Sequence, residues 1–126
     1  MIKIIKHIGL HILEKDLKPF YEDIIQFELL RSLILSENDC SKIFNIKENV
    51  NVLFGKCNDF ELELFVSKTP QTASFSHICL ATDTPSILAQ KAIEKGYKVH
   101  LRQNNTGGTY FITDSNKNVF EIKKIN

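Results

Sequence analysis

The chain has 126 residues, of which 43% are hydrophobic and 25% are charged, and its formal net charge is +1 at pH 7. Such values are ordinary for one globular domain. Acidic residues interrupt the scattered lysines, so the sequence offers no basic surface for nucleic acid or an anionic membrane. No apolar run is long enough to span a bilayer, and the first residues lack the apolar core of a signal peptide. The three cysteines are widely spaced, which predicts reduced thiols in a cytoplasmic protein.

In the first half, we expect a strand, a helix and three more strands. Alternation of apolar and polar residues predicts a strand over 2–12, and Asp16 is the expected N-cap of a helix over 17–25. Pro19 falls in the first turn of this helix, where a missing N–H is tolerated. Residues 36–39 are expected to end the second strand without forming a regular element. The three further strands are expected over 27–35, 50–55 and 60–66.

The second half repeats this order after a polar linker over 67–74. Thr84 is the expected N-cap of a helix, Pro85 suits its first position, and Gly96 suits its C-terminal end. Residues 104–108 are polar and contain two glycines, and we expect a loop there. The strands are expected over 75–82, 97–102, 110–113 and 119–125. The sequence therefore predicts an internal repeat of one supersecondary unit.

Each half carries a histidine near its start and a glutamate near its end. The sequence reads HIGL at 7–10 and HICL at 77–80, and the last strands read LELF at 62–65 and FEIK at 120–123. Two imidazoles and two carboxylates are suitable ligands for a divalent metal ion. The candidate ligands are His7, Glu63, His77 and Glu121.

Strand alternation allows these four side chains to share one face of their sheets. Successive side chains point to opposite faces, so His7 and His77 lie opposite the apolar residues that would pack under a helix. Glu63 and Glu121 lie opposite their apolar neighbours in the same way. All four side chains can therefore line one concave surface. Glu61 is the alternative ligand if the register differs by two residues, because it keeps the same parity.

In this order, the fragments resemble the vicinal oxygen chelate superfamily, which includes glyoxalase I, methylmalonyl-CoA epimerase, fosfomycin-resistance thiol transferases, extradiol dioxygenases and bleomycin-binding proteins. The resemblance covers nearly the whole chain. It implies an α+β fold of two βαβββ modules that form an open barrel-like cavity with one divalent metal ion. The modules would cover about residues 1–66 and 75–126 of a single domain. A homodimer is also implied, because many relatives share the cavity wall between protomers.

By this resemblance, the four candidate residues are the metal ligands, and the ion is nickel, zinc, cobalt or manganese. The metal would bind two neighbouring oxygens of the substrate and stabilise an enediolate. Glu121 would be the principal base that moves a proton between two carbons, and Glu63 would stand on the opposite side. We therefore expect a glyoxalase-I-like lyase or isomerase that acts on a small metal-chelating substrate.

Other functions fit the same residues. An epimerase or a thiol transferase would use the same scaffold, and whether glutathione or another thiol takes part stays open. A bleomycin-resistance-like protein would sequester a small molecule without chemistry, but such relatives typically lack the metal ligands. A ring-cleaving dioxygenase normally uses three ligands and iron in a larger chain, so it ranks lower. In each case we expect a small-molecule partner and neither nucleic acid nor a membrane.

Overall fold

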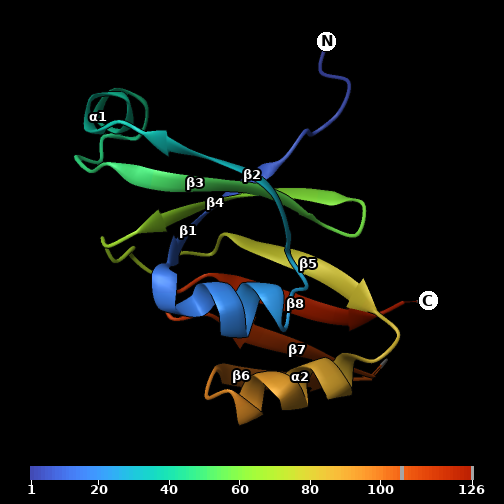
Figure 1. Cartoon of the computed structure of the whole chain (residues 1–126). Helices are drawn as coiled ribbons and strands as arrows, with labels where there is room; N and C mark the ends of the chain where they lie inside the picture. The colour runs from blue at the N-terminus through green and yellow to red at the C-terminus, as the bar shows by residue number, and fades with distance from the viewer. Residues whose placement is uncertain (106, 126) are drawn as a thin grey trace. The chain divides into compact units, whose positions relative to one another are not determined.

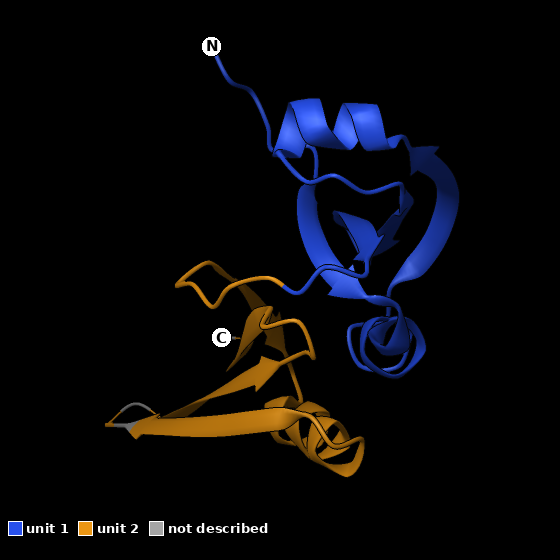
Figure 2. Cartoon of the chain, turned by 90° about the vertical axis from the view of Figure 1, so that its left-hand side faces the viewer, with its two compact units in different colours: residues 1–70 blue, residues 71–126 orange. Residues whose placement is uncertain are grey.

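The structure is a computed structural model of the chain and describes residues 1–105 and 107–125. The chain divides into two units, Met1–Pro70 and Gln71–Asn126, which are coloured separately in Figure 2. The boundary between them falls inside the linker that the sequence predicts over 67–74. Each unit contains one four-stranded sheet.

The first unit is built on a mixed sheet (Figure 1). Its elements are β1 (Ile8–Leu13), a short 3-10 turn η1 (Glu14–Asp16), a π-helix η2 (Leu17–Glu22), β2 (Glu28–Leu35), α1 (Glu37–Phe44), β3 (Val50–Cys57) and β4 (Phe60–Ser67). The strand order is β1-β4-β3-β2, in which β1 and β4 are parallel and the other neighbours are antiparallel. The helices η2 and α1 flank this sheet from opposite sides (Figure 2).

Both faces of the first sheet carry buried apolar side chains. Leu64 points to one face, whereas Val52 and its partner Phe65 point to the other, because side chains alternate along a strand. The side chains on the first face are fully buried together with those of the π-helix, and they include Ile12, Phe20, Tyr21, Leu62 and Leu64. The second face is covered by α1, and its buried cluster consists of Cys40, Val50 and Val52.

Three parts of this unit differ from the sequence-based expectation. β1 begins at Ile8 and not at residue 2, because its ladder with β4 starts at the pair Ile8–Leu62. Before that pair, Ile4 and Ile5 are 70% and 79% exposed. The expected helix over 17–25 is a π-helix, in which the Ile25 N–H donates to the carbonyl five residues earlier.

The helix α1 is the third difference, because the sequence predicts a break over 36–39. Ser36 caps this helix, and its Oγ accepts a hydrogen bond of 3.1 Å from the Asp39 N–H. Asn45 ends the helix in the left-handed conformation, with φ of 58°. The polar residues that indicate a break are therefore the cap and first turn of a short helix.

The second unit repeats the sheet topology of the first. Its elements are β5 (His77–Thr82), α2 (Pro85–Glu94), β6 (Lys98–Asn104), β7 (Gly107–Thr113) and β8 (Val119–Lys124). The strand order is β5-β8-β7-β6, and β5 and β8 are parallel. Its buried core consists of Ala89, Ala92, Ile112, Phe120 and Ile122.

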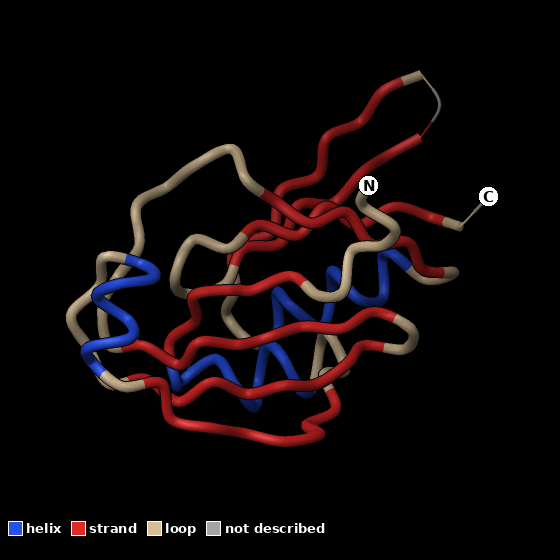
Figure 3. Tube along the Cα trace, turned by 90° about the horizontal axis from the view of Figure 1, so that it is seen from above, coloured by secondary structure: helices blue, strands red, loops and turns tan. Residues whose placement is uncertain are grey.

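The ends of the helix in the second unit follow the prediction, whereas β5 begins at His77 and not at residue 75, and one loop differs. Pro85 occupies the first turn of α2 after Thr84, and Gly96 has φ of 86°, which glycine adopts without strain. The loop expected over 104–108 is shorter, because β6 and β7 pair as far as Asn104 and Gly107 in a long hairpin (Figure 3). Thr106 lies outside the described residues.

The hairpin between β7 and β8 turns through a buried aspartate. The Asp114 carboxylate accepts three hydrogen bonds of 2.8 Å, from the backbone N–H of Asn116 and from the backbone N–H and Nδ2 of Asn118. Lys117 adopts a positive φ of 69° within this turn. Gln71 joins the linker to the turn, because its Nε2 donates to Asn118 Oδ1 at 2.8 Å.

Each unit therefore has the order βαβββ, with α1 inserted in the first unit. This confirms the α+β fold class and the internal repeat that the sequence predicts. Within residues 1–105 and 107–125, the structure has no helix that is both long and apolar enough to cross a membrane.

Candidate functional site

The same strand register brings a histidine to a glutamate in both units. On the parallel β1–β4 ladder, Gly9 pairs with Glu63, and on the parallel β5–β8 ladder, Cys79 pairs with Glu121. His7 precedes Gly9 by two residues, and the histidine of the second unit precedes Cys79 by two. Residues two apart on a strand share a face, so each histidine lies on the side of its sheet that carries the glutamate.

In the first unit, His7 Nε2 contacts Glu63 Oε2. The Glu63 side chain is 12% exposed, and the His7 side chain is 47% exposed. Glu61, the alternative candidate, is an exposed residue of the same strand. A nearly buried carboxylate beside a half-exposed imidazole leaves one side of the pair open to a ligand.

In the second unit, two hydrogen-bonding contacts fix the orientation of His77. Its Nδ1 lies 2.9 Å from the Phe75 carbonyl oxygen, and its Nε2 lies 3.1 Å from Glu121 Oε1. A carbonyl oxygen only accepts hydrogen bonds, so Nδ1 carries a proton. In the neutral imidazole, the lone pair of Nε2 then faces a carboxylate oxygen.

Two electron-pair donors in this arrangement need a cation or a proton between them. Metal-bound histidines usually donate their second ring N–H to a carbonyl or a carboxylate, as His77 does here. The other oxygen of Glu121 faces a cation already, because Lys123 Nζ lies 3.4 Å from Oε2. The donor set of each unit therefore fits half of a His₂Glu₂ site for a divalent ion.

The structure brings the four predicted ligands together as two pairs, one in each unit. Among the residues it describes, no group of three or more histidine, cysteine, aspartate or glutamate side chains is placed to hold a metal ion. His100 is an exposed residue of β6, which lies at the opposite edge of the second sheet from β5.

The cysteines are free thiols throughout the described chain. Burial raises the pKa of the Cys57 thiol to about 11, so this group stays protonated at neutral pH. Burial also raises the pKa of Cys79, and the nearby Glu121 charge raises it further. Neither thiol has the lowered pKa of an activated nucleophile.

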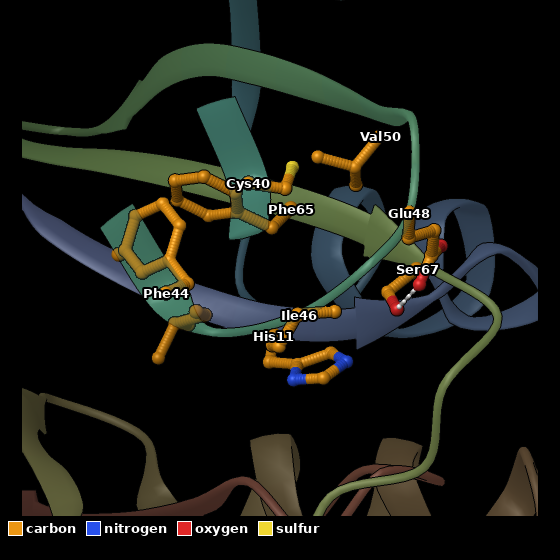
Figure 4. A pocket seen from close by; sticks show the side chains of 10 residues that line it. His11, Cys40, Phe44, Ile46, Glu48, Val50, Phe65 and Ser67 are labelled. Carbon is orange, nitrogen blue, oxygen red and sulfur yellow. Dashed lines mark hydrogen bonds between the residues drawn. The ribbon is translucent and has the colours of Figure 1, made fainter. Parts of the chain in front are cut away.

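A cavity on the α1 side of the first sheet is a feature that the sequence reading missed (Figure 4). Its volume is about 200 Å³. The apolar residues that line it include Cys40, Phe44, Ile46, Val50 and Phe65, and the polar residues are His11, Glu48 and Ser67. Helix α1 forms one wall, and its Ser36 cap was the sequence signal that could have revealed it.

A second hollow, of about 420 Å³, lies beside the histidine of the first unit. Lys6, His7 and Lys56 line it together with Asn58 and Asp59 of the β3–β4 turn. Because Ile4, Ile5 and Phe60 also line this hollow, the surroundings of His7 are mixed, whereas the first cavity is mainly apolar.

Glu48 is held at the end of the first cavity by three hydrogen bonds. The hydroxyls of Ser67 and Thr69 each donate to Oε1 at 2.8 Å, and the Lys68 N–H donates to Oε2 at 2.9 Å. Burial raises the pKa of this carboxyl, but the hydrogen bonds and the charge of His11 lower it by more, so the pKa lies below its usual range. Glu48 is therefore ionised at neutral pH and anchors the end of β4.

We expect Glu48→Gln to destabilise the protein at neutral pH but not in acid. A carboxyl whose pKa is lowered by folding stabilises the fold above its unfolded pKa, and this contribution disappears as the pH falls through the folded pKa. Thermal unfolding from pH 7 to pH 3 would measure the difference in Tm between wild type and variant. A difference that stays constant across this range would contradict the role of the charge, and Glu94→Gln, an exposed helical site, is the matched control.

Comparison with known proteins identifies the fold. No protein-family model matches the chain, and no curated protein matches its sequence. The fosfomycin resistance protein FosX from Listeria monocytogenes matches with a TM-score of 0.76 and 15% identity, over 100% of this chain and 96% of that one. A variant of the same protein, complexed with manganese(II) and 1S,2S-dihydroxypropylphosphonic acid, matches with a TM-score of 0.75 and 17% identity, over 100% and 95%.

A glyoxalase family protein from Bacillus anthracis matches as well, with a TM-score of 0.67 and 18% identity, over 100% of this chain and 98% of that one. Fosfomycin resistance proteins and glyoxalases share the fold of the vicinal oxygen chelate superfamily. This chain therefore has that fold, as the sequence resemblance predicts.

Proposed function

We propose that the protein is a divalent-metal-dependent enzyme in which the two histidine–glutamate pairs together bind one ion. The ligands would be His7, Glu63, His77 and Glu121. The observation that carries this proposal is the orientation of His77, whose Nδ1 is held by the Phe75 carbonyl while Nε2 faces Glu121 Oε1. The equivalent pair in the first unit, at the matching strand register, supports it.

The bound ion would act as a Lewis acid on a substrate that chelates it through two neighbouring oxygens. Glu121 would take a proton from the substrate carbon, and Lys123, 3.4 Å from Oε2, would orient this carboxylate. Glu63, largely buried against His7, would act from the opposite side. This assignment gives a glyoxalase-I-like isomerase or lyase that moves a proton between adjacent carbons.

A second candidate is the addition of water to a small epoxide, which gives a vicinal diol. The complex of the Listeria protein with 1S,2S-dihydroxypropylphosphonic acid favours it, because that ligand is a vicinal diol and the same complex contains manganese(II). An epimerase or a thiol transferase on the same scaffold remains a further alternative. A substrate panel of hemithioacetals and small epoxides would separate the first two candidates.

Calorimetry with nickel, zinc and manganese tests the proposal on the chelator-treated full chain. We expect one ion per chain and at least a hundredfold loss of affinity in His77→Ala/Glu121→Ala, since both ligands of one pair are removed. His100→Ala/Glu94→Ala removes an exposed histidine and an exposed glutamate and is expected to bind as the wild type does. Equal affinity in both double variants would contradict the site, and two ions per chain would contradict sharing of one ion.

We also propose that the protein is a homodimer, as in many relatives whose cavity wall is shared. Sedimentation gives the mass directly. Mixing the variants His7→Ala and His77→Ala then tests where the pairs meet. If each site combines pairs from two protomers, the mixture regains metal binding that neither variant has alone, whereas a monomer shows no gain.

A further inference from the structure

We propose that the cavity beside α1 is a subsite for a compact, uncharged apolar group of the substrate, of about the size of a benzene ring. This inference rests on the proposed function, because it assigns the part of the substrate that does not chelate the metal. It is carried by the position, the lining and the charge of the cavity.

The cavity adjoins the histidine–glutamate pair of the first unit on the same face of the sheet. Phe65 lines the cavity and follows Glu63 by two residues on β4, so the two side chains share a face. Gly9, another lining residue, pairs with Glu63 across the β1–β4 ladder. A group attached to a substrate held at Glu63 therefore reaches the cavity along one surface.

Aromatic and aliphatic side chains form most of the wall. The rings of Phe44 and Phe65 meet edge to face, with centroids 5.2 Å apart, and Figure 4 shows them beside Cys40. Phe44 remains 48% exposed, although it is a large apolar side chain on the wall of a cavity. A ligand that covers this surface would gain the free energy of apolar burial.

The charge of the cavity excludes an anionic group. None of the described residues that line it is a lysine or an arginine, and Glu48 is a carboxylate whose oxygens accept hydrogen bonds from Ser67, Lys68 and Thr69. A phosphonate or carboxylate placed here would lie against this negative charge, and no lysine or arginine of the described lining would offset it. The hollow beside His7 differs from the cavity, because Lys6 and Lys56 line it together with Asp59 and Glu61.

The size of the cavity limits the group that fits. An apolar cavity of roughly 150 Å³ holds one benzene molecule. A cavity of about 200 Å³ therefore accepts a single ring or a branched alkyl chain of similar volume. Two fused rings would need the wall to move.

Fluorine NMR of fluorobenzene with the metal-free full chain tests the cavity itself. We expect saturable binding to the wild type, at least a tenfold weaker Kd in Ile46→Trp, which fills the cavity, and no change in Ile43→Trp. Ile43 lies on α1, three residues before Ile46, and is 63% exposed, so it is the matched control. Methylphosphonate is expected not to compete. Absence of saturable binding, or equal binding by Ile46→Trp, would overturn the subsite.

A second measurement connects the cavity to the metal site. Mandelate and lactate are both 2-hydroxy acids, but mandelate has a phenyl ring where lactate has a methyl group. The manganese-loaded protein should therefore bind mandelate about tenfold more tightly than lactate. Ile46→Trp should abolish this preference. If the tryptophan variant does not fold, Ile46→Ala serves as the test, because the enlarged cavity should also accept the naphthyl analogue of mandelate. Equal affinities in the wild type would overturn the subsite. Fluorobenzene binding without metal binding would instead contradict only the proposed function.

Discussion

Replacement of Glu121 by glutamine is expected to lower kcat by roughly 10²–10⁴-fold on any substrate that the metal-loaded protein turns over. Glutamine keeps the size of the side chain but cannot accept the proton, and it is a weaker ligand beside His77 Nε2, which lies 3.1 Å from Glu121 Oε1. Turnover would be measured at saturating metal for each variant, so that loss of the ion is separated from loss of the base.

Glu94→Gln, at an exposed position of α2, controls for the change of one charge. Glu63→Gln is expected to lower kcat as well, because its carboxylate faces His7 at the matching register. Full turnover by Glu121→Gln would show that the base is a different group. Retained metal affinity together with lost turnover would support a role in proton transfer in addition to metal binding.

The substitution Gly55→Ala is expected to lower the free energy of unfolding by about 3 kcal/mol, the upper part of the range for overpacking in a dense core. A Cβ atom at Gly55 would overlap both the Glu28 carbonyl oxygen and the ring of Phe27. The carbonyl belongs to the backbone of β2, and the ring is 6% exposed, so neither can move without displacing its neighbours. Urea denaturation followed by circular dichroism would measure the change.

Gly108→Ala provides the comparison within a strand of the other unit. Its Cβ would meet Leu101 Cδ1 at 2.8 Å, and the end of a half-exposed leucine side chain can turn away. We therefore expect a much smaller loss for Gly108→Ala than for Gly55→Ala. Equal losses would mean that the Glu28 backbone and the Phe27 ring make room for a Cβ atom at Gly55 as easily as the Leu101 side chain does at Gly108.

The features that the sequence predicted depend on local residue patterns that favour one backbone conformation over others. Thr84 and Pro85 begin α2, and the hairpin around Asp114 turns through aspartate and asparagine side chains. The repeat also placed each histidine and glutamate on one face, and the parallel ladders bring them into contact as two pairs. Whether the pairs bind one ion stays a prediction.

The features that the sequence did not predict depend on tertiary partners. Residues 2–6 alternate like a strand, but alternation cannot show whether a neighbouring strand is present, and the ladder begins only at Ile8. Helix α1 has eight residues, which is too short for a clear periodic pattern, and its Ser36 cap also fits a turn. The apolar cavity remained hidden because α1 supplies its wall.

Parallel pairing of the first and last strands has a consequence for folding. Each histidine–glutamate pair joins the two ends of its unit, so its donors meet only when the last strand closes onto the first. Contacts between distant parts of the chain form slowly, because a long loop must be ordered before they stabilise it. During synthesis, the first strand of each unit therefore stays unpaired until its last strand has emerged, and the proposed metal site would form only at the end of folding.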